Sequence, residues 1–312
     1  MDPENPNDPP QTPDLGAGPA PADPASAPAA PAVSDRGFAL TRDSVTIGSA
    51  LSTATEVWQR DVGTWALAQF LVFLIGFGIP TALGAILGIS EVMLGGEELS
   101  RVTKAILDGL GFGVQFLQTI LQGVLIMGFT AMGFRALHGE PARVGMIFSQ
   151  VQKALKYFLQ LVAIWIPMGL TMAVVGVLVW LLSVGSVDVD MPLEEAMTLL
   201  LPSLWVLALI LLPIFIFVFM GILFAASELT YNDRSGPIES IVSSWRITRG
   251  HRWQVLGASF LAGIIAVASF LLCGVGILFG GPLSALILGA LYLALRDGAD
   301  VPEADTTSTL GG

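Results

Sequence analysis

Residues Pro237–Trp253 read PIESIVSSWRITRGHRW, and this stretch indicates how the whole chain is organised. Its apolar side chains are spaced so that a helix would place four of them on one face: Ile238, Ile241, Val242 and Trp245. Basic residues crowd its second half, and a long apolar run follows directly. The pattern predicts an amphipathic helix that lies on a membrane surface and leads into a membrane-spanning helix.

The composition excludes an ordinary soluble domain. Hydrophobic residues make up 54% of the 312 residues, charged residues only 12%, and the mean hydropathy is +0.74. The net charge of −11 falls mostly in the two ends of the chain and in the loops that we place outside the cell. No folded basic surface remains away from the membrane, so we expect no binding to nucleic acid.

Six apolar segments are long enough to cross a bilayer, which takes roughly 20 residues of helix. We expect the spans at Thr64–Gly88, Ala105–Phe134, Tyr157–Gly185, Leu199–Ser227, Gln254–Leu272 and Pro282–Leu295. Pro80 should kink the first span without breaking it, because neighbouring helices can satisfy the carbonyl that it leaves unpaired. A glycine-rich connection, Gly274–Gly281, is expected to join the last two spans.

The two ends of the chain lack an apolar pattern. Residues 1–43 are acidic and rich in proline and alanine, and residues 298–312 are again acidic. Such segments bury too little surface to offset the entropy lost on ordering. We therefore predict disordered ends around a six-span membrane domain at residues 44–297.

The opening stretch has two weaker counterparts. Aligning it on Pro141–Tyr157 and on Ser49–Trp65 places an aromatic residue at the start of each odd-numbered span. The predicted fold is all-α: six transmembrane helices with three cytoplasmic interfacial amphipathic helices, in a pseudo-threefold repeat of one amphipathic helix plus two spans. Residue identity between the units is low, and amphipathic loops in any multi-span protein are the alternative explanation.

The segment Glu228–Trp253 resembles a signature of bacterial six-span membrane proteins. This group includes the membrane domain fused to some glycerophosphodiester phosphodiesterases and related stand-alone proteins. The matching positions are Glu228, Gly236, Pro237, Ser244, Trp245, Arg246, Thr248, Gly250 and Trp253. The resemblance implies the fold and a bacterial cytoplasmic (inner) membrane. It does not imply phosphodiesterase activity, which belongs to a separate soluble barrel that this chain has no room to hold.

Residues that carry enzyme chemistry are scarce. Neither His138 nor His251 has an acidic partner at helical spacing, and no cluster shows the spacing of metal ligands. Cys273 lies in an apolar run and is expected to be a small packing residue. We expect no catalytic site, no metal and no cofactor.

One candidate site lies at the membrane interface. It comprises Trp245, Arg246, Arg249, Arg252 and Trp253. Arginines near tryptophans at the cytoplasmic surface are typical of binding to anionic lipid headgroups. The alternative is that these arginines only set the topology of the protein.

A second candidate is a polar stripe on the second span, formed by Asp108, Gln115, Gln118 and Gln122. Glutamine side chains in hydrocarbon are unfavourable unless paired, so the stripe should face the interior of the bundle. It would be either a path for a small substrate or a set of interhelical hydrogen bonds, each contributing about 0.6 kcal/mol. Gln69 and Gln160 are possible partners.

These observations predict a non-enzymatic integral membrane protein. It would engage lipid, particularly anionic lipid, and organise or shape the membrane through its cytoplasmic interfacial helices. Protein partners or self-association are compatible with this interpretation. The alternatives are a transporter or channel component for a small substrate, and a membrane anchor for a separately encoded enzyme.

The charge distribution yields a prediction about topology. With the N-terminus in the cytoplasm, all but Arg101 and Lys104 of the 14 Lys and Arg residues fall on the cytoplasmic side. A reporter fused at Gly312 should therefore behave as cytoplasmic, and one inserted near Asp190 as external. The reverse outcome in a reporter-fusion assay would contradict the predicted orientation.

Overall fold

Six helices in the computed structural model are long and apolar enough to cross a membrane. The structure describes residues 38–93, 101–183, 205, 209, 211–272 and 275–310, and these form helices and turns without strands. The six helices are Val62–Ser90, Val102–Leu137, Val144–Leu178, Leu211–Tyr231, Arg252–Leu271 and Ile277–Arg296. The all-α, six-span fold is therefore confirmed. Residues 1–37, Cys273 and parts of the expected third and fourth spans lie outside the described residues.

The first span is preceded by a separate helix, α1 (Ile47–Arg60). Thr46 and Ser49 begin α1 with reciprocal bonds, in which each hydroxyl accepts from the backbone N–H of the other residue, at 3.1 and 2.8 Å. Asp61 ends α1 and caps the next helix, α2 (Val62–Phe73), by accepting the N–H of Thr64 at 3.1 Å. The cap at Asp61 thus separates α1 from the span.

Pro80 does not interrupt the first span. The helix passes from α2 through a single π-helical turn, η2 (Leu74–Gly78), into α3 (Ile79–Met93). A proline removes one backbone donor and crowds the preceding turn. The π-helical turn is wider than an α-helical turn and accommodates both the missing donor and the crowding. In it, the N–H of Ile79 donates to the carbonyl of Leu74, five residues earlier.

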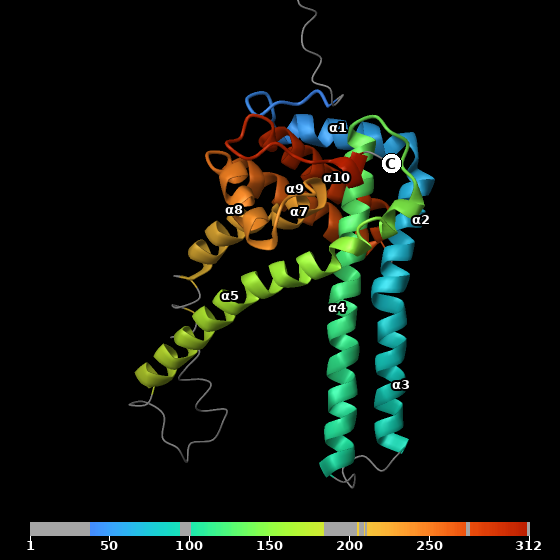
Figure 1. Ribbon diagram of the computed structural model, residues 1–312, viewed down its shortest axis with the longest axis vertical. Coiled ribbons are helices and arrows are strands. Elements are labelled where there is room, and N and C mark those ends of the chain that lie inside the picture. Colours follow the sequence, from blue (N-terminus) through green and yellow to red (C-terminus); the bar gives the residue numbers. More distant parts are fainter. Residues whose placement is uncertain are drawn as a thin grey trace, which may run out of the picture. The chain divides into compact units, whose positions relative to one another are not determined.

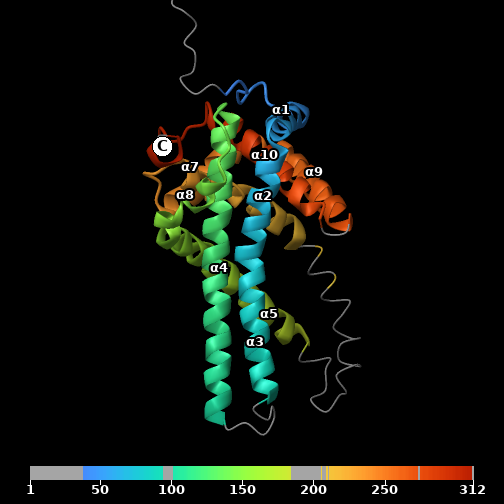
Figure 2. The same ribbon diagram turned by 90° about the vertical axis from the view of Figure 1, so that its right-hand side faces the viewer.

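The second span, α4 (Arg101–Leu137), runs back beside α2 and α3 (Figures 1 and 2). Its last third is buried, whereas most of its first half is exposed. Gly128 allows a close approach there, because a Cβ at this position would lie 1.8 Å from the carbonyl oxygen of Ile147. The chain after α4 therefore folds back onto the buried end of α4.

The second expected amphipathic helix is not an α-helix. Its residues form two short 3₁₀ segments, η4 (Val144–Phe148) and η5 (Val151–Lys153), before the long helix α5 (Ala154–Ser183). Ile147 is buried against α4, whereas Phe148, Val151 and Leu155 are exposed, so these residues are not gathered on one face of a regular helix. The contact of Ile147 with Gly128 and the inward position of Lys153 favour tight turns over a regular helix. The repeat of three amphipathic helices is therefore not confirmed.

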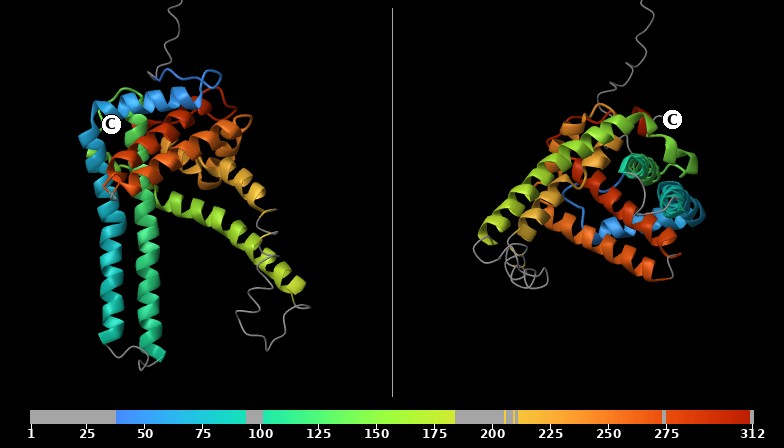
Figure 3. Two further views of the ribbon diagram at one scale, coloured as in Figure 1. Left: turned by 180° about the vertical axis from the view of Figure 1, so that it is seen from behind. Right: turned by 90° about the horizontal axis from the view of Figure 1, so that it is seen from below.

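The C-terminal half contains α7 (Ala225–Tyr231), α8 (Pro237–Thr248), α9 (Arg252–Leu271) and α10 (Ile277–Arg296). Helix α10 is the most buried of the six spans and packs against α1, α2, α4 and α9 (Figures 1 and 3). Around Tyr292, the rings of Phe134, Phe224 and Tyr231 lie 5.2–5.9 Å away between centroids. This aromatic cluster is the centre of the core.

Helix α10 begins five residues before the expected sixth span. The segment Ile277–Gly281, expected as part of a loop, is helical, and Pro282 lies within the helix. A Cβ at Gly280 would lie 1.8 Å from the hydroxyl oxygen of Ser269 on α9. Glycine is needed here for close packing of two helices rather than for a turn.

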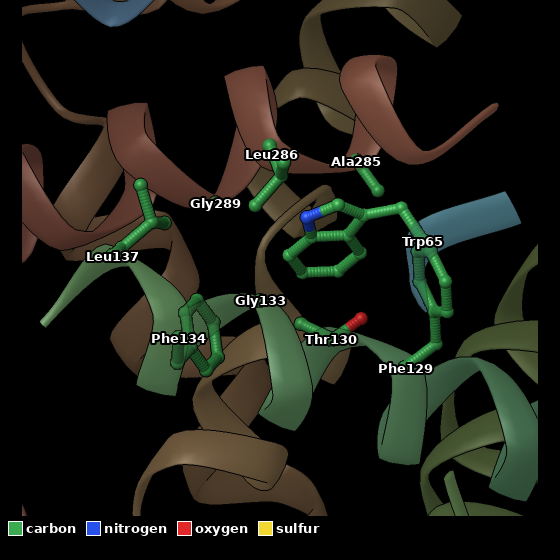
Figure 4. Close-up of a pocket in the computed structure, with 9 residues that line it drawn as sticks. All are labelled: Trp65, Phe129, Thr130, Gly133, Phe134, Leu137, Ala285, Leu286 and Gly289. Atoms are coloured by element: carbon green, nitrogen blue, oxygen red, sulfur yellow. The ribbon is translucent and has the colours of Figure 1, made fainter. Parts of the chain in front are cut away.

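A small cavity lies between α2, α4 and α10 (Figure 4). Trp65, Phe134 and Leu286 line it, together with other mostly apolar groups. None of the glutamines of the polar stripe contributes to its lining. The cavity is a packing feature of the apolar core.

The folded unit extends beyond the expected limits of 44 and 297. Phe38 and Leu40 pack against the core, and Arg42 donates to three carbonyls, those of Ile247, Leu295 and Arg249. At the other end, residues 298–310, for which we expected disorder, are among the residues that the structure describes. These residues form a described segment that ends in α11 (Thr307–Leu310), and Thr309 is fully buried. Hydrogen bonds and a few apolar contacts with the core hold both ends.

Candidate lipid-interface site

A buried ion pair connects α7 to α10 beneath the candidate site. Glu228 is fully buried and accepts hydrogen bonds from Tyr292 (2.6 Å), Asn232 (3.2 Å) and Arg296, whose Nε and Nη2 lie at 2.8 and 3.1 Å. A buried charge is tolerated only when it is paired and hydrogen-bonded, and this carboxylate meets both conditions. No local pattern in the sequence indicates this pair, because Arg296 lies 68 residues after Glu228.

Lys153 makes a second inward contact. Its ammonium forms an ion pair with Asp233 at 2.7 Å and donates to the carbonyls of Leu229 and Thr230 at 3.0 and 2.7 Å. These carbonyls belong to the last turn of α7, where backbone acceptors lack helical partners. Lys153 therefore fixes the end of α7, a role that its charge alone does not indicate.

The C-terminal segment covers this polar region. Thr309 donates to the carbonyl of Thr230 at 2.8 Å, and Arg135 donates to the carbonyl of Thr309. Asp305 pairs with Arg234 at 3.1 Å. Hydrogen bonds from Thr307 hold the pKa of Asp305 below its ordinary value. Any stability gained from this depressed pKa is therefore present at neutral pH and is lost only as the pH falls through the lowered value.

Helix α8 is shorter than the expected Pro237–Trp253. It begins with Pro237 in its first turn, where the missing N–H has no effect, and Glu239 accepts the N–H of Gly236 at 3.3 Å. It ends at Thr248, and Gly250 has a φ of +85°, a conformation that glycine adopts without strain. The stretch is thus two helices joined by a tight turn, and Trp253 belongs to α9.

On α8 the polar side faces the protein interior and the apolar side faces outward, which is the opposite of a helix that covers the core of a soluble protein. The buried residues are mostly hydroxyl-bearing: Ser240, Ser243, Ser244, Ile247 and Thr248. The exposed side carries Ile238, Val242 and Trp245, which are 69%, 44% and 36% exposed. Such an arrangement is typical of a helix that turns its apolar side toward lipid.

Ser244 explains why a polar face points inward. The helix of the fourth span is interrupted at residues 223–224, which leaves backbone groups without helical partners. The hydroxyl of Ser244 donates to the carbonyl of Gly221 at 2.8 Å and accepts the N–H of Phe224 at 3.1 Å. Beside it, Gln160 on α5 donates to Ser240 at 2.8 Å. Hydrogen bonds therefore fix α8 to two spans.

Trp245 lies directly over Gly221. A Cβ at Gly221 would be 2.0 Å from the indole ring, so any larger residue there would displace the tryptophan. The ring of Phe217 meets that of Trp245 edge-on at 5.8 Å. These contacts hold one side of the indole against the fourth span and leave the rest exposed.

The expected interface residues divide into two groups. Arg246, Arg249 and Trp253 are exposed, and Trp253 is 84% exposed. Arg252 is half-buried instead, with its guanidinium carbon 3.7 Å from the ring centre of Phe217 and 4.4 Å from that of Trp245. The structure brings Trp245 and Arg252 into contact, which the sequence spacing did not predict.

The polar stripe does not meet its expected partners. Asp108 and Gln115 are exposed on α4, and Gln118 and Gln122 are half-buried. Gln160 is bonded to Ser240 on α8, and Gln69 lies against Gly281 on α10, with 3.1 Å between its amide oxygen and a Cβ built on that glycine. Gln160, suggested as a possible partner of the stripe, is directed by α5 toward α8 instead.

Within the residues that the structure describes, no group of three or more His, Cys, Asp or Glu side chains is placed to hold a metal ion. The ring of His138 contacts the carbonyl of Phe134 at 2.7 Å, and that of His251 contacts the amide oxygen of Gln254 at 2.9 Å. Both histidines thus make local contacts near the ends of helices.

Comparisons with protein-family models, with curated proteins and with solved structures find no match for this chain.

We predict that Glu228→Gln destabilises the protein strongly. The substitution keeps the shape of the side chain but leaves Arg296 charged and unpaired in the interior, which typically costs about 3–5 kcal/mol. The melting temperature in detergent should fall clearly. The control is Glu56→Gln, which breaks an exposed pair with Arg60 and should change stability by less than about 1 kcal/mol. Equal melting temperatures for the two variants would contradict the role of the buried pair.

We also predict that Gln118→Leu folds normally. The side chain is half-buried and its suggested partner Gln160 is bonded to Ser240, and even one interhelical hydrogen bond would contribute only about 0.6 kcal/mol on average. The yield of folded protein should match that of the wild type, and the melting temperature should change only slightly. A failure to fold would show that Gln118 has an essential partner.

Proposed function

We propose that the protein is a non-enzymatic, multi-pass membrane protein that engages anionic lipid through α8 and organises or shapes the membrane. The observation that carries this proposal is the orientation of α8, with serines inward and Ile238, Val242 and Trp245 outward. We place it in the bacterial cytoplasmic membrane with both termini in the cytoplasm, following the charge distribution and the resemblance of the α8 segment.

The charges around α8 support a preference for anionic lipid. The guanidinium groups of Arg246 and Arg249 are exposed next to the apolar face, and neither forms an ion pair among the described residues. A basic residue near an anionic membrane surface contributes about 1 kcal/mol of attraction. Arg135, Lys153, Arg234 and Arg296, in contrast, are already paired with carboxylates.

The attachment of α8 supports a role in shaping the membrane. Ser240 and Ser244 bond α8 to α5 and to the fourth span, so that its apolar face is held at a fixed position relative to the spans. A fixed apolar face adds a constant area to one leaflet, whereas a loosely tethered helix adjusts its depth. In our proposal, α8 therefore shapes the membrane by occupying a constant area in one leaflet.

Transport of a small substrate is the second candidate function. Asp108 and Gln115 are exposed on a helix of membrane-spanning length, where polar side chains normally face a partner or a water-filled path. The membrane anchor for a separate enzyme has no specific contact in its favour. We therefore rank lipid engagement first and transport second.

The proposal predicts that anionic lipid stabilises the protein. Reconstitution into phosphatidylcholine vesicles with a rising fraction of phosphatidylglycerol should raise the melting temperature. Added salt should reduce this effect, because exposed charges are screened over about 8–10 Å at physiological ionic strength. The double variant Arg246→Gln/Arg249→Gln should lose most of the effect, and Arg60→Gln, which removes an arginine already paired with Glu56, should keep it.

A melting temperature that does not respond to phosphatidylglycerol would overturn the proposal. So would an equal response of the double variant and the wild type. A solute flux across the vesicle membrane that Gln115→Leu abolishes would favour transport instead.

A further inference from the structure

Three elements meet at Arg252. This arginine is the first residue of α9, and its guanidinium contacts the ring of Phe217 on the fourth span and that of Trp245 on α8. We call these two rings the aromatic clamp. Cation–π contact with an aromatic face orients the planar guanidinium while leaving its edge available for hydrogen bonds.

The guanidinium of Arg252 has no acceptor among the described residues. It forms neither a hydrogen bond nor an ion pair there, and its Nε is shielded from solvent without a partner. Arg42, by comparison, donates to three carbonyls, and Arg296 donates to Glu228 and to the carbonyl of Pro302. A donor that is shielded from water and has no acceptor is unfavourable. The corner between α8 and α9 therefore lacks one anionic or carbonyl ligand.

The surroundings of Arg252 favour an anion. It lies at the N-terminus of a 20-residue helix, where the dipole is positive. Arg246 and Arg249, both exposed, precede it by six and three residues. Phosphate is the preferred partner of such a group, because two of its oxygens match the planar fork of a guanidinium.

An apolar stripe leads away from this corner along α9. It consists of Trp253, Phe260, Ile264 and Val267, which are 84%, 70%, 50% and 61% exposed. These residues recur every three to seven positions, so they share one side of the helix. A stripe that starts at a cationic corner matches a molecule with a charged head and an apolar chain.

We propose that the corner between α8 and α9 binds a single anionic phospholipid. Arg252, held by the aromatic clamp, donates to the headgroup phosphate, and an acyl chain lies along the stripe of α9. This inference rests on the proposed engagement of anionic lipid and adds a defined site to it. The ligand is a phospholipid rather than free phosphate, because the stripe contributes only to the binding of an acyl chain.

The test uses the full-length protein in a mild detergent, titrated with short-chain phosphatidylglycerol and followed by native mass spectrometry. We expect one tightly bound lipid. Arg252→Lys should weaken its binding about tenfold, since an ammonium keeps the charge but lacks the planar fork. Phe217→Leu should weaken binding as well, because it removes half of the clamp at a 53% exposed position without changing the charge. The matched control Arg246→Gln removes one nearby charge and should change affinity no more than about twofold.

Two outcomes would overturn the proposal. If Arg252→Lys and Phe217→Leu bind lipid as the wild type does, while Arg246→Gln is weaker, attraction by surface charge alone explains the binding and the defined site is wrong. Competition by excess inorganic phosphate as strong as that by the lipid would show that the acyl chain has no role. In either case, stabilisation by anionic vesicles still tests the broader function separately. Melting temperatures of all variants establish that each is folded.

Discussion

The bonded pair of Glu228 and Arg296 is the interaction on which the rest of the structure depends. It lies where α7, α10 and the C-terminal segment meet, and the aromatic core surrounds Tyr292, which also donates to Glu228. A charge in an apolar interior must be fully satisfied, so the positions of α7 and α10 are fixed relative to each other. The segment between α7 and α10 must therefore take a path that keeps Glu228 and Arg296 in contact.

Helix α8 shows one consequence. Because α7 is fixed, the interruption of the fourth span before it needs a local partner, and Ser244 supplies one from α8. The polar side of α8 is thereby used inside the protein, and its apolar side faces outward. Arg252 follows at the start of α9, next to the two rings that this packing brings together. The same packing of α8 thus stabilises the fold and positions the residues of the proposed lipid contact.

Local patterns predicted the spans and the start of α8 well, because hydropathy and helix caps act over a few neighbouring residues. They failed where contacts join distant residues. The ion pair of Glu228 joins residues 68 positions apart, and the C-terminal segment is held by Arg135, 174 positions from its partner Thr309. Neither contact has a periodic signal. Arg252 was predicted only as one of several interface residues and Lys153 received no individual role, and the structure gives each of them a specific position.

The central claim is that the outward face of α8 contacts acyl chains. A nitroxide at position 242, introduced as Val242→Cys after replacement of Cys273 by alanine, tests this claim directly in vesicles. Power-saturation spectroscopy should find the label more accessible to oxygen than to a water-soluble nickel complex. A label at Arg143, exposed in the connection after α4, should show the opposite preference. A label at position 242 that prefers the nickel complex would contradict the account.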